Sequence, residues 1–220
     1  MNIIMQLDKF KNQPLNFYIE ENPGDGLGNF IQCTPTIRHL SNHYNQPIPV
    51  YFNREWVKQC FIDIPYLTPI SEKKGIRLFG SELHDLDHRS TPDFEYIQKI
   101  VLGEVKGNET FIRNPNKIQG DYGVFINGAG SENPNYLQQK LVNSDIQQIV
   151  RDNSKDLIIG LGSKNDEARN IFPGCYGDIE IALNIIGGAK WVITNNTGFY
   201  HVAGALKKDQ LILWKDCPYP

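Results

Sequence analysis

The chain has 220 residues, of which 40% are hydrophobic and 21% are charged, enough to bury a core in one large or two small domains. Its formal net charge of −3 gives no electrostatic basis for tight binding to nucleic acid, which is not expected as a partner. No segment approaches the roughly 18 to 20 uninterrupted apolar residues of a membrane helix, so no transmembrane segment is predicted.

The cellular location is predicted from the N-terminus and the cysteines. The first residues contain no basic region followed by a long apolar run, so no secretory signal is expected. The four cysteines, Cys33, Cys60, Cys175 and Cys217, are scattered and form no CxxC pair. The sequence therefore predicts a reducing, cytoplasmic location without a zinc site or a disulfide framework. We expect Cys33 to be a small buried thiol on the apolar side of a helix.

Strand-like and helix-like segments alternate along the chain. Apolar runs predict strands at Leu15–Ile19, Ile48–Phe52, Ile76–Phe79, Tyr122–Ile126, Leu157–Leu161, Trp191–Thr194 and Leu211–Trp214. Helical spacing predicts helices that include Phe30–Tyr44, Asp93–Val105, Tyr136–Val150, Asp178–Ile186 and Gly198–Leu206. This alternation predicts parallel sheets in an α/β protein.

A polar segment, Lys106–Gly120, separates two sets of these elements and has the composition of a linker. We therefore predict two domains, residues 1–115 and residues 116–220. Each is close to the minimum size for a Rossmann-like unit, so we expect few insertions.

The first of three glycine-rich turns, residues 23–29, follows the first predicted strand and opens a helix. Glycines allow close approach of the backbone, and the unpaired N–H groups of a helix start suit a phosphate or an acidic sugar group. The same glycines also fit a tight turn that binds nothing, and Asn29 fits an ordinary N-cap. Both interpretations stay open at this point.

The second turn contains Gly128, Ala129, Gly130 and Ser131, and follows the strand that opens the second domain. Asn133 and Pro134, just beyond it, fit the start of a helix. We expect a diphosphate at this turn to be held by backbone donors and by the Ser131 hydroxyl.

The third turn contains Asn196, Thr197 and Gly198, and precedes a helix of small residues. His201 lies about one turn into that helix, where it can reach a ligand at the helix start; a histidine buried in the core is the alternative. In an open α/β sheet, ligands bind beyond the carboxyl ends of the strands, where all three turns are predicted. If the domains face each other, the first turn lies across a cleft from the other two.

These segments resemble, in order, the motifs of glycosyltransferase family 9, the ADP-heptose:lipopolysaccharide heptosyltransferases. Residues 195–206 resemble the family's NDTGxxHxAAAL signature, and residues 28–40 resemble its GDxLLTTPLLRAL motif. Residues 128–131 resemble its GAGS loop, and residues 157–162 with Asp166 and Glu167 resemble a segment whose acid contacts the donor ribose.

The resemblance implies a minimal GT-B fold, in which two small Rossmann-like domains face a cleft. The N-terminal domain would then lie on the acceptor side, and the C-terminal domain would bind a nucleotide-sugar. It also implies an inverting, metal-independent sugar transfer from a nucleotide-diphosphate donor, with no cofactor besides that substrate. The implied donor-binding residues are Gly128, Ala129, Gly130, Ser131, Asn196, Thr197, Gly198 and His201 for the diphosphate, and Asp166 or Glu167 for the ribose. The acceptor hydroxyl and the oligomeric state are not predicted.

Two positions depart from the family pattern. The aspartate proposed as the family's base is Asn29 here, and the aspartate of the third motif is Asn196. An amide cannot accept a proton at neutral pH, so neither residue can be a general base. If the enzyme is active, we predict Asp25 as the base, with Asn29 beside it facing the acceptor.

Two other functions stay open. In the first, catalysis is lost and the protein binds a nucleotide, a sugar or a partner. In the second, the protein is a transferase that acts on DNA or on a nucleobase. The histidines and aspartates of His84–His88 suggest a metal site, but the surrounding polar residues and Pro92 favour a solvated acidic loop. Trp214 is a candidate for stacking on a base or a sugar.

Overall fold

The computed structural model describes residues 15–22, 26–80, 93–128, 142–162 and 167–213. The chain divides into two compact units, Met1–Arg113 and Asn114–Pro220, which we call unit 1 and unit 2. The sequence analysis placed the division two residues later, between residues 115 and 116. In the described ranges, no helix is long and apolar enough to cross a membrane.

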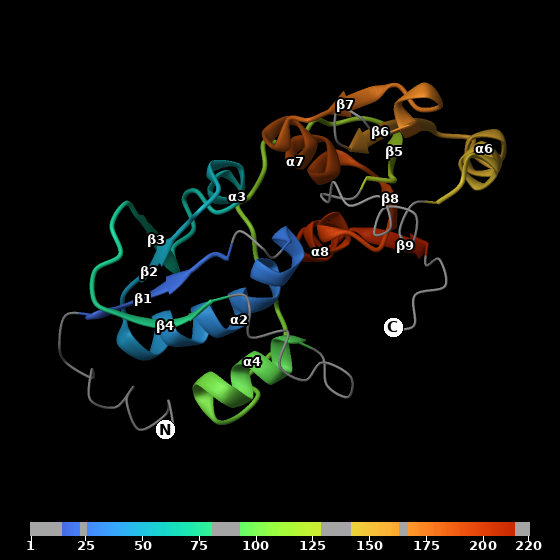
Figure 1. Ribbon diagram of the computed structural model, residues 1–220. Helices are drawn as coiled ribbons and strands as arrows, with labels where there is room; N and C mark the ends of the chain where they lie inside the picture. The colour runs from blue at the N-terminus through green and yellow to red at the C-terminus, as the bar shows by residue number, and fades with distance from the viewer. Residues whose placement is uncertain (1–14, 23–25, 81–92, 129–141, 163–166, 214–220) are drawn as a thin grey trace. The chain divides into compact units, whose positions relative to one another are not determined.

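Unit 1 is built on a four-stranded sheet whose neighbouring strands are all parallel, in the order β3-β2-β1-β4. Helix α2 lies along this sheet, and α4 packs on α2 (Figure 1). The strands are β1 Phe17–Glu20, β2 Ile48–Tyr51, β3 Leu67–Ile70 and β4 Ile76–Gly80. The helices are α2 Leu27–Tyr44, α3 Glu55–Gln59 and α4 Asp93–Leu102.

The core of unit 1 follows from the alternation of side chains along its strands. Phe17 and Ile19 of β1, and Ile48 and Val50 of β2, are buried on the same face. The ring of Phe17 lies 5.5 Å from that of Tyr44 on α2, which identifies this face as the one that α2 covers.

Helix α2 contains Pro35, which has no N–H to donate to the carbonyl of Ile31. The hydroxyl of Thr34 donates to that carbonyl instead, at 2.6 Å, and accepts a hydrogen bond from the N–H of Phe111 at 3.0 Å. Thr34 is fully buried. One side chain therefore replaces a missing helical hydrogen bond and attaches the segment after α4 to α2.

Two neighbouring threonines allow this role to be tested. Thr36 is also fully buried on α2, but within the described residues its hydroxyl has no hydrogen-bond partner. Thr34→Val should lower the free energy of unfolding by about 1–3 kcal/mol, because it leaves two buried backbone groups without a partner. Thr36→Val should be neutral or stabilising, because it removes an unsatisfied hydroxyl. Urea unfolding of both variants measures the difference, and equal losses would contradict it.

Unit 2 is built on five parallel strands in the order β7-β6-β5-β8-β9. The central strand β5 is buried along its whole length. The strands are β5 Tyr122–Ile126, β6 Leu157–Gly162, β7 Gly174–Tyr176, β8 Trp191–Asn195 and β9 Asp209–Leu213. The helices are α6 Ser144–Asn153, the 3-10 helix η3 Glu167–Asn170, α7 Ile179–Gly188 and α8 Gly198–Ala205.

Trp191 closes the amino ends of these strands. Its indole Nε1 donates to Oδ2 of Asp156 at 2.9 Å, and this bond is the main reason that the pKa of Asp156 lies below its ordinary value. A Cβ atom at Gly123 would lie 2.1 Å from the indole ring, so only glycine fits there. Trp191 is therefore a packing residue at the amino ends of the strands, opposite to the edge at which ligands of open α/β sheets bind.

All seven predicted strands are present, with ends shifted by at most two residues where the structure describes them. The two strands that the sequence analysis missed, β3 and β7, are edge strands. Strand β3 contains Pro69, which interrupts the strand pattern but is tolerated at a sheet edge, and β7 has three residues.

One helix prediction is confirmed in part: residues 144–150 belong to α6, and residues 136–141 lie outside the described ranges. The predicted helix 136–150 crosses Asn143, whereas Asn143 is the N-cap of α6 and its side chain accepts a hydrogen bond from the N–H of Ile146 at 3.0 Å. The apolar periodicity continued through a residue whose side chain favours starting a helix.

Candidate functional site

The candidate site of unit 2 lies where its strand order reverses. Strands β5 and β8 are neighbours, with Ile126 paired to Thr194, although β6 and β7 lie between them in the chain. Ligands of open α/β sheets bind at such a switch point, beyond the carboxyl ends of the strands. Gly128 follows β5 there, and Asn196 follows β8. The structure thus brings Gly128, the one described residue of the second predicted turn, and the third predicted turn to one edge of one sheet.

The third turn ends at the start of α8. Thr197 is the N-cap, and its hydroxyl accepts a hydrogen bond from the N–H of Phe199 at 3.4 Å. Gly198 is the first residue of the helix, whose first turn contains no acidic residue. The positive end of the α8 dipole is therefore not compensated by a carboxylate from its own first turn, a condition that favours an anion.

His201 is the fourth residue of α8 and is partly exposed, so the alternative of a histidine buried in the core is wrong. Its ring lies 3.7 Å from the ring of Tyr200, between centroids, at an interplanar angle of 34°. This contact restricts the orientation of the imidazole within the first turn of the helix.

Asn127 lies at the edge of the candidate site, and the sequence analysis did not single it out. Its side chain is buried and binds both backbone groups of Val142: Nδ2 donates to the carbonyl at 2.9 Å, and Oδ1 accepts from the N–H at 2.8 Å. Gln147 of α6 donates to the same carbonyl at 3.0 Å. Asn127 therefore holds together the two ends of the segment that contains the second turn. An asparagine directly after a buried strand was the available signal.

In unit 1, the predicted site residue Asn29 is the third residue of α2 and is partly exposed. The N-cap of α2 is Gly26, so the interpretation of Asn29 as an N-cap is wrong. The N–H of Asn29 instead donates to the carbonyl of Gly26 at 3.1 Å, and its own carbonyl accepts from Sγ of the buried Cys33 at 3.4 Å. Cys33 is the buried thiol that the sequence predicted.

A buried carboxylate stands beside this helix start. Glu21 follows β1, is fully buried, and accepts hydrogen bonds from the N–H groups of Asn53 (2.9 Å) and Arg54 (3.1 Å). The guanidinium of Arg54 adds a bond from Nε at 2.7 Å and a second from Nη2. Since β1 and β2 are neighbours, these bonds fix the ends of both strands to each other.

A second acid extends the polar edge of unit 1. Glu20 pairs with Lys73 and lies 3.5 Å from Nε of Arg77. Partial burial raises the pKa of Glu20, but hydrogen bonds from Lys73 and Asn53 and the two positive charges outweigh it and leave the pKa below its ordinary value. Glu20 is thus an ionised partner of two cations.

The other predicted residues are only partly placed. Glu167 is the first residue of η3, the next described element after β6, and β6 is the neighbour of β5 in the sheet. Several predicted residues lie outside the described ranges, namely Asp25, Ala129, Gly130, Ser131, His84–His88, Asp166 and Trp214. Among the residues that the structure does describe, no three His, Cys, Asp or Glu side chains form a group suited to a metal ion.

Two parallel α/β units with Rossmann-like strand orders define the GT-B class of fold, and solved structures of that class match this chain. TibC, a dodecameric iron-containing heptosyltransferase from enterotoxigenic E. coli, aligns with a TM-score of 0.68 and 13% identity over 93% of this chain and 59% of its own. The chain thus spans about three fifths of the length of TibC.

Two further solved structures are covered more completely. A glycosyltransferase family 9 protein from Veillonella parvula aligns with a TM-score of 0.64 and 11% identity, over 90% of this chain and 80% of its own. The E. coli ADP-heptose lipopolysaccharide heptosyltransferase II aligns with a TM-score of 0.61 and 13% identity, over 91% and 85%. Compared by sequence, the chain matches no protein-family model and no curated protein. The predicted α/β fold class and the resemblance to family 9 are confirmed at the level of the fold.

Proposed function

We propose that the chain is a glycosyltransferase that takes a sugar from a nucleotide-diphosphate donor to an acceptor hydroxyl. The observation that carries this proposal is the switch point of unit 2, where Gly128 after β5 and Asn196 after β8 share one edge, and α8 starts at Gly198. Backbone N–H groups and a helix dipole stabilise the charge of a leaving diphosphate without help from a side-chain cation.

In this proposal, unit 2 binds the donor. Residues 128–131, residues 196–198 and His201 hold the diphosphate, and Asp166 or Glu167 binds the ribose. Support comes from TibC, which has been solved in complex with ADP-D-β-D-heptose and shares this fold. The transfer is proposed to be inverting and metal-independent, with the donor as a substrate and no resident cofactor.

Unit 1 is proposed to bind the acceptor. Asp25 is the proposed base that removes the proton of the acceptor hydroxyl, and Asn29 lies nearby to orient it. The rival function is nucleotide or sugar binding without catalysis, and the amides at Asn29 and Asn196 are the observation that favours it.

Donor binding is tested by thermal unfolding with ADP, UDP, GDP and their sugar conjugates. A nucleotide at 100 times its Kd should add about 2.7 kcal/mol to the free energy of unfolding. Failure of every nucleotide to raise the Tm would contradict the proposal.

A pair of N-cap variants makes the test specific to the switch point. Thr197→Ala removes the N-cap side chain of α8. Asp178→Ala removes the N-cap side chain of α7, which accepts a hydrogen bond from the N–H of Ile181 at 3.0 Å. Each should cost about 1 kcal/mol of stability, but only Thr197→Ala should weaken nucleotide binding in calorimetry. Equal affinities would place the nucleotide elsewhere.

A further inference from the structure

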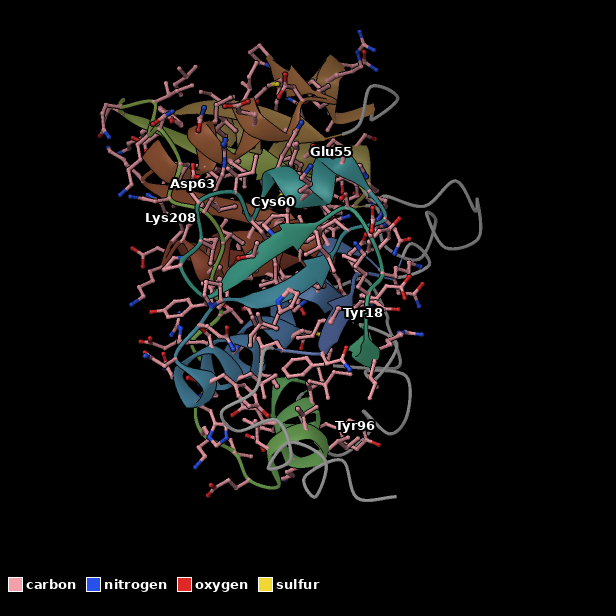
Figure 2. All side chains as sticks on the ribbon, turned by 90° about the vertical axis from the view of Figure 1, so that its left-hand side faces the viewer. Tyr18, Glu55, Cys60, Asp63, Tyr96 and Lys208 are labelled. Atoms are coloured by element: carbon pink, nitrogen blue, oxygen red, sulfur yellow. The ribbon has the colours of Figure 1, made fainter. Side chains whose placement is uncertain are left out.

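An exposed tryptophan stands at the carboxyl edge of the sheet of unit 1. Trp56 is the second residue of α3, which follows β2, and 42% of it is exposed. Figure 2 shows α3 between the labelled Glu55 and Cys60, at its start and just past its end. Within the described residues, no protein group accepts a hydrogen bond from its indole N–H, in contrast to Trp191, whose N–H is bound by Asp156.

The surroundings of Trp56 are rigid. The guanidinium carbon of Arg54 lies 5.1 Å from the centroid of the Trp56 ring. Arg54 is itself held by the buried carboxylate of Glu21 and donates from Nη2 to the carbonyl of Asn22 at 3.3 Å. The guanidinium lies over one face of the Trp56 ring and is held there by its partners, so a ligand would meet the other face of the ring as a preformed surface.

Hydrogen-bonding groups border this surface. Asn53 is exposed, and its Nδ2 donates to Oε1 of Glu20 at 3.2 Å and to the carbonyl of Glu21, so Oδ1 is the atom of this amide that can accept from a ligand. An exposed aromatic ring beside fixed polar groups suits a ligand with one apolar and one polar side, because the ring removes C–H groups from water while polar groups fix the orientation. A pyranose ring has both an apolar C–H face and polar hydroxyl groups.

The charges decide which sugars fit. The guanidinium of Arg54 is paired with the carboxylate of Glu21, and Glu20 is paired with Lys73. The cation nearest to Trp56 is thus already neutralised, so it offers little attraction to a carboxylate or phosphate on a ligand. An uncharged sugar does not need an unpaired cation in order to bind.

We propose that Asn53, Arg54 and Trp56, which we call the Trp56 surface, bind an uncharged sugar ring. Trp56 stacks on the C–H face of the ring, and Asn53 and Arg54 bind its hydroxyl groups. The surface is a binding site in its own right; its assignment as the acceptor subsite rests on the proposed function.

The experiment uses the indole N–H signals of the full ¹⁵N-labelled chain. The three tryptophans give three signals, and Trp56→Phe identifies that of Trp56 by its loss. The probes are methyl β-D-glucoside, methyl α-D-mannoside and lactose, with glucuronate and glucose 6-phosphate as charged counterparts at constant ionic strength. At least one neutral sugar should shift the Trp56 signal saturably, and the charged counterparts should bind no more tightly.

A matched control comes from the other end of the same sheet. Tyr66, just before β3, also lies under an arginine, with the guanidinium of Arg38 at 5.1 Å. Trp56→Ala should abolish sugar binding measured by calorimetry, and Tyr66→Ala should leave it unchanged. The proposal is overturned if no neutral sugar shifts the Trp56 signal, if the charged sugars bind more tightly, or if Tyr66→Ala removes binding equally.

The outcome is separable from that of the proposed function. If the chain binds a nucleotide but no sugar, only the proposal for the Trp56 surface is contradicted. If the chain binds a sugar but no nucleotide, the proposal for the Trp56 surface is supported and the glycosyltransferase proposal is contradicted.

Discussion

Glu21→Leu should lower the free energy of unfolding by about 3–5 kcal/mol, since it breaks a buried ion pair and leaves its partner groups behind. The carboxylate is fully buried, and its loss deprives the N–H groups of Asn53 and Arg54 and the Arg54 guanidinium of their acceptor. The loss should fall toward the lower end of that range, because 21% of the Arg54 side chain is exposed and water can solvate part of its charge. Urea unfolding measures the change.

The double variant Glu21→Leu/Arg54→Met should lose less than the sum of the two single variants, because no uncompensated charge is left. Glu55→Leu is the matched control. Glu55 pairs with Lys58 at 3.2 Å, but its side chain is 68% exposed, and such surface pairs contribute about 0–1 kcal/mol. If Glu21→Leu costs no more than Glu55→Leu, the buried pair does not hold the edge of unit 1 together.

Asp25→Asn should lower turnover by about two to four powers of ten, the usual contribution of a general base. The amide has nearly the shape of the carboxylate but cannot accept the proton. Donor affinity should not change, because the proposed donor groups belong to unit 2. Turnover is measured with the nucleotide-sugar identified by thermal unfolding, and affinity by calorimetry.

Two further variants sharpen this prediction. Asp63→Asn changes an exposed aspartate of unit 1 that adopts a left-handed conformation (φ 59°), which asparagine also tolerates, and should leave turnover unchanged. Asn29→Asp restores the carboxylate of the resembled family. Recovery of turnover by Asn29→Asp in the Asp25→Asn background would show that position 29 can host the base. Full activity of Asp25→Asn alone would exclude Asp25 from the mechanism.

The sequence predicted the strands that carry many apolar residues, because burial on both faces leaves continuous apolar runs such as Tyr122–Ile126. The edge strands were not predicted. A strand at a sheet edge need not be fully buried, and not all of its residues need to donate a backbone N–H, as Pro69 in β3 illustrates. For the predicted helix 136–150, the start of α6 at Ser144 was missed, because periodicity does not register a capping residue such as Asn143.

The candidate site was predictable where it depends on the order of glycines and polar residues after strands, as at Gly128 and Thr197. The hydrogen-bond partners of Asn127 and Glu21 were not predictable, because they are distant in the chain: Val142 for Asn127, and Asn53 and Arg54 for Glu21. Local patterns do not determine which distant backbone groups a polar side chain will meet.

The clamp that Asn127 forms on Val142 joins two positions 15 residues apart in the chain. With both ends of that segment fastened at one point, residues between them can be inserted, deleted or exchanged while β5 and α6 keep their registers. Under the proposed function, donor preference could therefore diverge during evolution, or be exchanged between chains of this fold, without redesigning the sheet. A chimera should retain Asn127, Val142 and Gln147 and exchange only what lies between Asn127 and Val142.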